Sequence, residues 1–397
     1  MKCIDEVDIN NKRILMRTDF NVPVNEAGAI TDDTRIKAHL RTIGYCLERN
    51  AKVILMSHMG RPKGQRVDKL SLRPVTAVLS KLLKKDVTFV DDCVGEAVEK
   101  AVAAMRQGDV ILLENLRFHI GDEKNDPEFA KELAKLCDVY VDDAFAVAHR
   151  KAASNAAITQ FAPVSVAGFL LKDEIEYFNK AMKNPARPLV AIVGGAKVSD
   201  KIGVLENLID KVDKLIIGGG MAFTFLKALG NEIGKSLCEY DMVDKAKEIM
   251  DKAKVKEVGI YLPRDCVAAD KAEAGVATKV IPVDQIPKDY MGLDIGPDTI
   301  SLFAEALKGV NTIVWNGPMG MFELEAFSKG TFAVANAVAD SGALSIIGGG
   351  DTDSAVHKAG VSSKISYIST GGGAFLELLE GKTMPAVEAL EGAGGRS

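Results

Sequence analysis

The stretch LSIIGGGD, residues 344–351, is an apolar run that stops on three glycines and an aspartate. Comparable endings recur at 188–195 (PLVAIVGG), 214–220 (KLIIGGG) and 365–373 (ISYISTGGG). A buried strand that is followed through glycines by an amphipathic segment is typical of a parallel βα unit. A single glycine run of this kind is better explained by a turn than by a surface for a phosphorylated ligand. Its repetition makes the strand ends of the whole chain informative.

The same alternation of short apolar runs and longer amphipathic segments extends along the whole chain. In the first half, strands are expected at 13–17, 52–58, 87–90, 110–118, 139–145 and 164–169. In the second half, they are expected at 188–195, 214–220, 259–265, 312–318, 344–350 and 365–373. These runs are continuously apolar, which indicates strands covered by helices on both faces. The sequence therefore predicts an α/β fold of doubly wound, Rossmann-like parallel sheets.

Length and composition indicate two domains. With 397 residues, 47% of them hydrophobic, the chain exceeds what one ordinary core holds. Between the halves, apolar residues repeat at helical spacing over 171–182, and Asn184, Pro185 and Pro188 then interrupt the pattern. We therefore expect a hinge helix and linker over 171–187, which join an N-terminal domain, 1–170, to a C-terminal domain that begins at 188.

Charge, cysteine content and hydropathy argue against several classes of protein. The formal net charge of −5 gives no support to a nucleic-acid binder. The six cysteines form no CxxC pair and are interpreted as reduced thiols of a cytoplasmic protein. No signal peptide is recognised, and no apolar run is long enough to cross a membrane. No spacing of histidine and cysteine indicates zinc, and His39 and His119 are interpreted as ordinary residues.

Polar and basic residues follow the expected strands of the first half. In an open parallel sheet, ligands bind beyond the carboxyl ends of the strands. The residues at these positions are Arg17, Asp19, Asn21, Arg35, His58, Arg61, Arg117 and Arg150. Arginine binds phosphate or carboxylate through two parallel hydrogen bonds. Any one of these arginines is equally well explained by a surface ion pair, but five at one sheet edge favour an anion site.

Glycines take the corresponding positions in the second half. They are Gly194, Gly195, Gly218, Gly219, Gly220, Gly317, Gly348, Gly349 and Gly350. Because glycine has no Cβ atom, it lets a ligand approach the main chain closely. Neither GxxxxGK[ST] nor GxGxxG occurs, which argues against a P-loop NTPase and an ordinary dinucleotide fold. A cationic half and a glycine-rich half suit one anionic substrate and one nucleotide that domain closure brings together.

Thirteen stretches in a fixed order carry a resemblance to a known family. They are MRTDFNVP, TDDTRI, SHMGRPKG, ENLRFH, DDAFAVAHR, AGFLLKDE, VGGAKVSDKI, IIGGGMAFTFL, MGLDIGP, VWNGPMGMFE, IIGGGDT, STGGGA and LELLEGKTMPAVEAL. Over essentially its whole length the chain resembles the phosphoglycerate kinase family. The resemblance implies reversible, Mg²⁺-dependent transfer of the acyl phosphate of 1,3-bisphosphoglycerate to ADP, which gives 3-phosphoglycerate and ATP. It also implies a cytoplasmic monomer of glycolysis that closes about a hinge and has no nucleic-acid or membrane partner.

The resemblance assigns one substrate to each domain. For phosphoglycerate it implies the N-terminal residues Arg17, Asp19, Asn21, Arg35, His58, Arg61, Arg117 and Arg150. For the nucleotide it implies, in the C-terminal domain 188–379, Gly195, Lys201, Gly219, Gly220, Gly292, Leu293, Asn316, Pro318, Glu323, Gly349, Gly350, Asp351 and Thr352. Asp351 would bind Mg²⁺, because an aspartate beside phosphates would otherwise repel them. The resemblance further implies that 380–397 packs back on the N-terminal domain.

The implied reaction needs no general base, because an ADP phosphate oxygen and a carboxylate are both ionised at neutral pH. Catalysis should then depend on alignment and on stabilisation of the charge on the transferring group. The candidate catalytic groups are Arg35, Lys197, Lys201 and the backbone amides of Gly371, Gly372 and Gly373. Two alternatives stay open from the sequence: an NAD-dependent dehydrogenase, and a catalytically silent nucleotide-binding scaffold.

The chain departs from the usual pattern of the family in two places. Asp142 stands where the family usually has Asn, and Ala146 and Val147 replace a smaller pair. Phe375 occupies a position that is usually small and polar. None of these changes removes an assigned ligand residue, but a carboxylate added near the anion site is expected to alter affinity.

Overall fold

The computed structural model describes residues 1–394 and forms two compact units. Unit 1 comprises Met1–Ile175 together with the described residues from Thr383 onward, and unit 2 comprises Glu176–Lys382. The first division falls inside helix α7 (Phe169–Met182), so one continuous helix contributes to both units. The chain therefore passes from one unit to the other twice. The last three residues of the segment expected at 380–397 lie outside the described residues.

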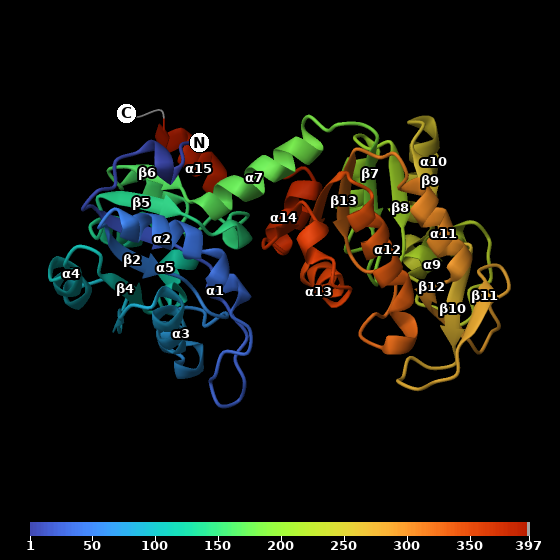
Figure 1. Ribbon diagram of the computed structural model, residues 1–397, viewed down its shortest axis with the longest axis horizontal. Helices are drawn as coiled ribbons and strands as arrows, with labels where there is room; N and C mark the ends of the chain where they lie inside the picture. The colour runs from blue at the N-terminus through green and yellow to red at the C-terminus, as the bar shows by residue number, and fades with distance from the viewer. Residues whose placement is uncertain (395–397) are drawn as a thin grey trace. The chain divides into compact units, whose positions relative to one another are not determined.

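Unit 1 contains a six-stranded parallel sheet in the order β3-β4-β2-β1-β5-β6. Strands β2, β4, β5 and β6 of this sheet are labelled in Figure 1. The strands are β1 (Arg13–Arg17), β2 (Lys52–Met56), β3 (Val87–Val90), β4 (Val110–Leu113), β5 (Val139–Asp142) and β6 (Ser165–Ala167). The α-helices are α1 (Thr34–Ala38), α2 (Leu40–Glu48), α3 (Arg73–Leu83), α4 (Glu96–Ala103), α5 (Ile120–Glu123), α6 (Pro127–Ala134) and α15 (Pro385–Gly394). Strands β4 and β5 are buried at every residue, whereas the edge strand β3 is partly exposed. The central strands are thus continuously apolar because they are buried on both faces, as the sequence predicts.

Unit 2 contains a second six-stranded parallel sheet, in the order β15-β14-β13-β7-β8-β9. The strands are β7 (Leu189–Val193), β8 (Lys214–Ile217), β9 (Gly259–Tyr261), β13 (Thr312–Asn316), β14 (Leu344–Gly348) and β15 (Tyr367–Ser369). The α-helices are α8 (Ile202–Ile209), α9 (Ala222–Ala228), α10 (Val243–Val255), α11 (Pro297–Ala306), α12 (Lys329–Asp340), α13 (Gly350–Lys358) and α14 (Gly373–Leu379). Two parallel sheets with flanking helices confirm the predicted fold class.

A small antiparallel sheet in unit 2 was not predicted from the sequence. Its strands are β10 (Asp265–Ala269), β11 (Lys279–Pro282) and β12 (Met291–Ile295), in the order β11-β10-β12. The single strand expected at 259–265 was wrong, because β9 stops at Tyr261 and Asp265 already belongs to β10. Strand β11 is mostly exposed and carries no apolar run, so the criterion used for buried strands missed it.

Most strands end two to five residues earlier than expected, because the expected ranges continued beyond the paired residues into polar residues and glycines of the following connection. Strand β4 ends at Leu113, and residues Leu116–Phe118 form the 3₁₀ helix η3. Strand β14 ends at Gly348, and helix α13 begins two residues later. Arg117 and Gly349, which the sequence assigned to ligands, lie in these two connections. No helix among the described residues is long and apolar enough to cross a membrane.

Candidate functional sites

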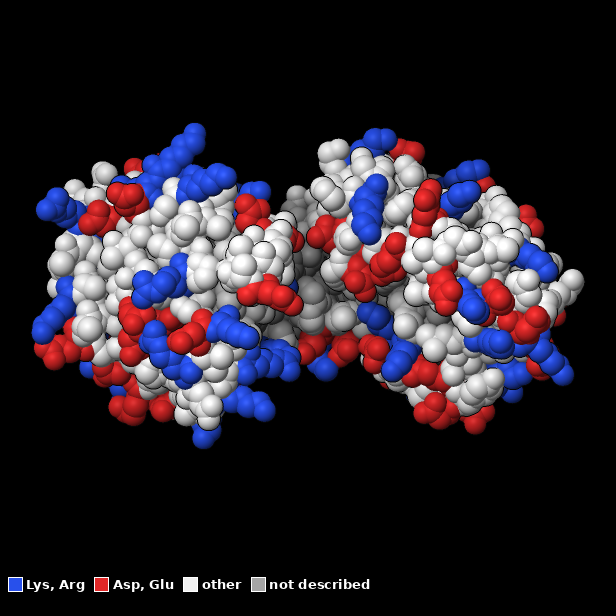
Figure 2. Space-filling model, turned by 90° about the horizontal axis from the view of Figure 1, so that it is seen from below, with Lys and Arg blue, Asp and Glu red and all other residues white. Residues whose placement is uncertain are grey.

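Charge on the surface is mixed. On the face drawn in Figure 2, basic and acidic side chains are interspersed over both units. With a net charge of −5 for the whole chain, binding of an anion depends on local arrangements of charge. Each unit has one such arrangement of its own.

Four arginines act electrostatically on one buried histidine at the carboxyl edge of the unit 1 sheet. Burial lowers the pKa of the His58 imidazole well below its ordinary value, and four guanidinium groups lower it further. These groups belong to Arg17, Arg117, Arg150 and Arg35. Because they act together on one side chain, strand ends far apart in the sequence contribute to a single cationic site.

Arg17 is the most enclosed of these arginines. It is the last residue of β1, and it is only 2% exposed. Its Nε donates to Ser154 Oγ at 3.1 Å, its Nη1 donates to the Thr18 carbonyl, and its Nη2 lies 3.2 Å from His58 Nδ1. Since the low pKa keeps the imidazole neutral, His58 can accept this hydrogen bond without adding positive charge.

Asp19, Asn21 and Arg35 form a hydrogen-bonded group on the same edge. Arg35 Nη1 lies 2.6 Å from Asp19 Oδ2, and the Arg35 side chain remains 43% exposed. Asp19 Oδ1 accepts a hydrogen bond from the backbone N of Asn21 at 3.2 Å. Asn21 Oδ1 in turn accepts from the backbone N of Gly60 at 2.9 Å. The structure therefore orients Asp19 and holds Arg35 at the solvent side of the site.

The remaining arginines differ in burial. Arg117 is buried and donates through Nη1 to the Gly60 carbonyl at 2.8 Å. Burial lowers the pKa of Arg117 to about 10, and the charges of Arg17 and Arg150 contribute to this shift. Arg150 and Arg61 are exposed, and Arg61 directly follows Gly60 in the chain. Positive charges that repel one another at close range are stabilised when an anion binds among them.

Asp142 is a buried carboxylate beside this cationic site. It ends β5, opposite Arg17 in the β1–β5 register, and it is fully buried. Its Oδ1 accepts from the backbone N of Ala144 at 3.0 Å, whereas its Oδ2 has no hydrogen-bond partner among the described residues. Burial raises the pKa of Asp142 to about 6, although the Ala144 hydrogen bond and Arg17 oppose this effect. Asp142, which stands where the family usually has Asn, thus lies next to the predicted phosphoglycerate site.

Unit 2 contains a cavity of about 510 Å³ at the carboxyl ends of its strands. Eight predicted nucleotide residues line it: Gly195, Gly219, Gly220, Gly292, Leu293, Pro318, Glu323 and Asp351. A cavity of this volume, formed mainly by apolar side chains and main chain, is suited to a ligand the size of a nucleoside. Glycines that the sequence left ambiguous therefore do form part of a ligand-sized space.

The glycines also have a packing role that a ligand does not explain. A Cβ atom on Gly219 would lie 2.6 Å from the backbone N and O of Gly195, and Gly219 has a φ of +69°. A Cβ atom on Gly317 would meet the backbone of Gly194. Three strand ends approach so closely that only glycine fits between them. By contrast, a Cβ atom on Gly350 would meet nothing within 4 Å.

A second predicted group lies at the neighbouring strand ends and is held by hydrogen bonds. Lys201 Nζ donates to Asn316 Oδ1, and Asn316 Nδ2 donates to the Gly348 carbonyl at 2.6 Å. Thr352 Oγ1 accepts from the backbone N of Gly317 at 2.7 Å. Burial lowers the pKa of Lys201, while Asp200, Asp351 and Glu380 oppose that shift. Lys201 and Asp351 are therefore close enough to influence each other electrostatically.

The remaining predicted catalytic groups are less constrained. Lys197 is exposed in the segment between β7 and α8. Gly371, Gly372 and Gly373 lie between β15 and the first turn of α14, and Gly372 has a φ of +46°. The backbone N of Gly371 donates to Ser369 Oγ at 3.1 Å. One of the three expected amides thus already has a partner within the chain.

The sequence missed the side-chain lining of the cavity. Apolar residues in this lining include Phe223, Leu237, Met291, Met319 and Met321. Asp294 also lines it, and burial raises the pKa of its carboxyl group to about 7. Strand β12, which carries Met291 and Asp294, belongs to the unpredicted antiparallel sheet. The sequence contained one signal for this part of the site, an aspartate inside the otherwise apolar sequence MGLDI. A carboxylate that is buried in a strand needs hydrogen-bond donors, and Asp294 accepts from the backbone N of Gly330.

Comparisons with known proteins agree over the whole chain. A family model described as phosphoglycerate kinase matches residues 4–382. A protein named phosphoglycerate kinase from Citrifermentans bemidjiense is 59% identical over 395 residues, which are 99% of each chain. A solved phosphoglycerate kinase structure from Coxiella burnetii aligns with a TM-score of 0.91 at 46% identity, covering 98% of both chains. One from Pyrococcus horikoshii aligns with a TM-score of 0.87 at 33% identity, covering all of both chains.

Proposed function

The chain belongs to the phosphoglycerate kinase family, and we propose that it uses the two described sites for the reaction of that family. It transfers a phosphoryl group between the acyl phosphate of 1,3-bisphosphoglycerate and ADP, which gives 3-phosphoglycerate and ATP. The dehydrogenase and the silent scaffold are not favoured, because relatives over the full length bear the name of the kinase. The assignments of residues that follow are proposals.

The observation that carries the proposal for unit 1 is that Arg17 Nη2 lies 3.2 Å from the buried His58 at the carboxyl edge of the sheet, where Arg117, Arg150 and Arg35 also act on His58 electrostatically. A phosphoglycerate carries negative charge on its phosphate and on its carboxyl group. The buried Arg17 and Arg117 bind and orient one anionic group, and the exposed Arg61 and Arg150 complete its surroundings. Asp19 and Asn21 hold the hydroxyl and carboxyl end, and Arg35 stabilises charge on the transferring group.

The cavity of unit 2 binds the nucleotide in this proposal. Its apolar wall accommodates the base, and Glu323, which is exposed on the cavity lining, binds the ribose. The phosphates lie along Gly349, Gly350 and Thr352 at the start of α13, whose free amides favour an anion. Lys201 and Asn316, which already contact each other, hold the phosphate to be transferred together with Lys197 and the glycines at 371–373.

The residues of unit 2 fit a Mg²⁺ ion that accompanies the nucleotide. Asp351 is exposed on the cavity lining, so its carboxylate is available as an oxygen ligand. Mg²⁺ typically takes one or two carboxylates together with phosphate oxygens and water. When bound, the ion neutralises phosphate charge that Asp351 would otherwise repel. The chain's own contribution is to place this carboxylate opposite the Lys201 ammonium group.

The two substrates bind to different units, so transfer requires them to meet. We place the hinge in α7, which contributes residues to both units. Closure would align the reacting oxygens and exclude the water that hydrolyses an acyl phosphate. We further propose a cytoplasmic monomer, in keeping with six cysteines that are all free thiols.

A single assay tests the proposed function. Purified protein is given 3-phosphoglycerate and MgATP, and hydroxylamine traps the acyl phosphate that forms. We expect hydroxamate to accumulate with both substrates and to require both. Formation of NADH from hydroxy acids would support the dehydrogenase instead, and nucleotide binding without hydroxamate would support the scaffold.

Substitution of Asp351 by Asn tests the proposed metal ligand. Loss of one carboxylate ligand should raise the Mg²⁺ concentration needed for half-maximal turnover by about tenfold, on the order of 1.4 kcal/mol. Asp353→Asn, two residues further along α13, is a control in the same helix. The measurement is turnover against free Mg²⁺ at fixed ATP. An unchanged Mg²⁺ dependence in Asp351→Asn would remove Asp351 from the site.

A further inference from the structure

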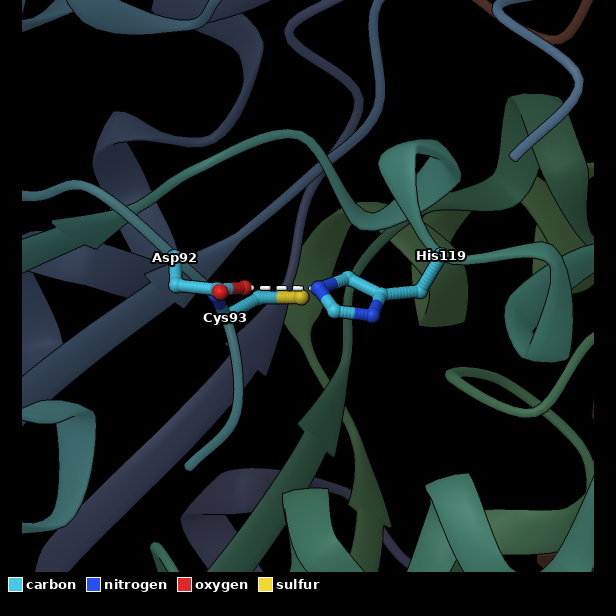
Figure 3. A group of neighbouring side chains, drawn as sticks. All are labelled: Asp92, Cys93 and His119. Carbon is cyan, nitrogen blue, oxygen red and sulfur yellow. Dashed lines mark hydrogen bonds and ion pairs between the residues drawn. The ribbon is translucent and has the colours of Figure 1, made fainter. Parts of the chain in front are cut away.

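Three side chains with metal-binding atoms converge in unit 1, and the proposed reaction uses none of them (Figure 3). A carboxylate oxygen of Asp92, the sulfur of Cys93 and a ring nitrogen of His119 all lie within 4.8 Å of one another. Asp92 and Cys93 lie between β3 and α4, and His119 lies between η3 and α5. Because β3 and β4 are paired, their carboxyl ends bring these two connections together.

The three residues differ in burial: Cys93 is buried, and Asp92 and His119 are partly exposed. Cys93 is 1% exposed, whereas the side chains of Asp92 and His119 are 49% and 36% exposed. Figure 3 shows the sulfur beside the line that joins the Asp92 carboxylate to the imidazole. Two of the three ligand groups are therefore accessible to solvent, whereas the sulfur is enclosed.

The ligand atoms are already oriented toward one another. Asp92 Oδ1 lies 2.6 Å from His119 Nε2 and also accepts a hydrogen bond from the backbone N of Cys93 at 2.7 Å. The His119 ring stacks on Phe129 with centroids 5.3 Å apart. Groups that neighbours hold in place lose little conformational freedom when an ion binds. Nε2 therefore faces the site before any ion arrives.

The charges around the sulfur favour a cation. The carboxylates of Asp92, Asp122 and Glu114 are close enough to the Cys93 sulfur to act on it electrostatically. Asp122 and Glu114 are themselves buried, and backbone amides bind both of them. The two carboxylates are thus held in position and add negative potential at the sulfur.

We propose that Asp92, Cys93 and His119 bind one Zn²⁺ ion, with water as the fourth ligand. One thiolate, one imidazole and one carboxylate form a ligand set that suits Zn²⁺ and does not suit Mg²⁺. Binding releases two protons to solvent, one from the thiol and one from His119 Nε2, and it replaces the hydrogen bond between Asp92 and His119 by two bonds to the ion. No zinc spacing is recognisable in the sequence, because residues 93 and 119 are brought together only by the pairing of β3 with β4.

The bound ion would connect two loops of unit 1 without entering the reaction. It would fix the segment after β3 to the segment after η3, and Arg117 lies in η3 two residues before His119. Anything that binds only the folded state stabilises it. We therefore expect Zn²⁺ to raise the unfolding temperature more than it changes turnover.

Titration of the full chain tests the proposal. After treatment with a chelator, the protein is titrated with Zn²⁺ by calorimetry and with Co²⁺ by absorption, in the absence of nucleotide. We expect one ion per chain and a near-ultraviolet thiolate-to-cobalt band. Cys93→Ser should remove that band and weaken Zn²⁺ binding by about 100-fold or more. Cys137→Ser, another buried cysteine of unit 1, is the matched control and should keep both properties.

His119→Asn and Asp92→Asn provide the same test without a change to the core, because both side chains are partly exposed. Each should weaken Zn²⁺ binding by about tenfold or more while hydroxamate formation persists. Absence of stoichiometric binding to the wild-type protein would overturn the proposal. Equal Zn²⁺ binding by wild-type protein and the Cys93 and His119 variants would also overturn it, because the ion would then bind elsewhere.

Discussion

Both sheets have their ligand sites at the carboxyl edge, but unit 1 forms its site from side chains and unit 2 forms its site largely from main chain. In unit 1, arginine side chains such as Arg17 and Arg117 lie at the carboxyl ends of the strands. In unit 2, the corresponding ends carry glycines such as Gly219, which leave the main chain open and allow strand ends to approach closely. A site formed by side chains can lose one binding group by substitution while the protein stays folded. A backbone site resists deletion and is disrupted by the addition of a single methyl group.

The largest effect is expected from Gly219→Ala, which adds that methyl group where the strand ends meet. The new Cβ atom would lie 2.6 Å from backbone atoms of Gly195, and the residue would keep a φ of +69°. Overpacking together with the positive φ should lower the free energy of unfolding of unit 2 by about 2–5 kcal/mol. Urea denaturation monitored by the only tryptophan, Trp315, reports on this unit. Wild-type stability in Gly219→Ala would show that unit 2 glycines serve the ligand alone.

Asp142→Asn should have the next largest effect, because it removes a buried negative charge from the arginine-rich edge. The pKa of Asp142 is raised from 3.8 to about 6, a difference that corresponds to about 3 kcal/mol. The wild-type protein therefore loses stability as pH rises from about 4 to about 6, and the variant should not. At pH 7.5 we expect the variant to be more stable by up to about 3 kcal/mol, measured by urea denaturation across this pH range.

Asp138→Asn is the control of opposite sign. A hydrogen bond from Arg13 lowers the pKa of the partly exposed Asp138, so its charge stabilises the fold at neutral pH. Loss of this charge should slightly destabilise the protein. If Asp142→Asn behaved in the same direction, the buried carboxylate of Asp142 would be a favourable partner of Arg17 and our account of this edge would be wrong.

Arg35→Ala should reduce turnover by about 10-fold to 100-fold, since one charge-assisted hydrogen bond contributes about 1.5–3 kcal/mol. Its fold should persist, because Arg35 is partly exposed and its ion pair with Asp19 lies at the surface of the site. Arg41→Ala removes another arginine with an ion pair to an aspartate and should leave turnover unchanged. Near wild-type turnover in a folded Arg35→Ala protein would contradict the role assigned to this side chain.

The smallest effect on stability is expected from Gly350→Ala, the counterpart of Gly219→Ala. A Cβ atom at position 350 meets nothing within 4 Å, so stability should change by no more than about 0.5 kcal/mol. The methyl group would nevertheless cover main chain at the start of α13, where the phosphates are proposed to lie. We expect the KM for ATP to rise several-fold while the KM for 3-phosphoglycerate stays constant. Equal changes in both constants would place the phosphates elsewhere.

Much of the fold follows from the sequence because buried parallel strands produce long apolar runs. Strands β1 and β3 begin and end where these runs do. The ends of β4 and β14 were predicted too late, since the expected ranges included polar residues and glycines that follow the paired residues. Strand β11 was missed for the opposite reason, because an exposed strand needs no apolar run.

Most of the predicted site residues share one property, which is a position at the end of a strand or shortly after it; Arg35, in α1, is an exception. This property identifies Arg17 and Gly219 without knowledge of the third dimension. It cannot identify Phe223 or Met321, which line the cavity from a helix and a loop. It also cannot identify Cys93 and His119 as neighbours, because no local spacing records which strands pair.

Helix α15 has a consequence for the synthesis of the chain. Its residues Ala386, Val387 and Leu390 are buried, and the Ala386 amide donates to the Ala148 carbonyl of unit 1. A ribosome that has made residues 1–175 has therefore not yet made the last piece of the unit that those residues begin. More than 200 further residues, which form all of unit 2, must emerge before α15 can dock. The first unit to be translated is thus the last to be completed.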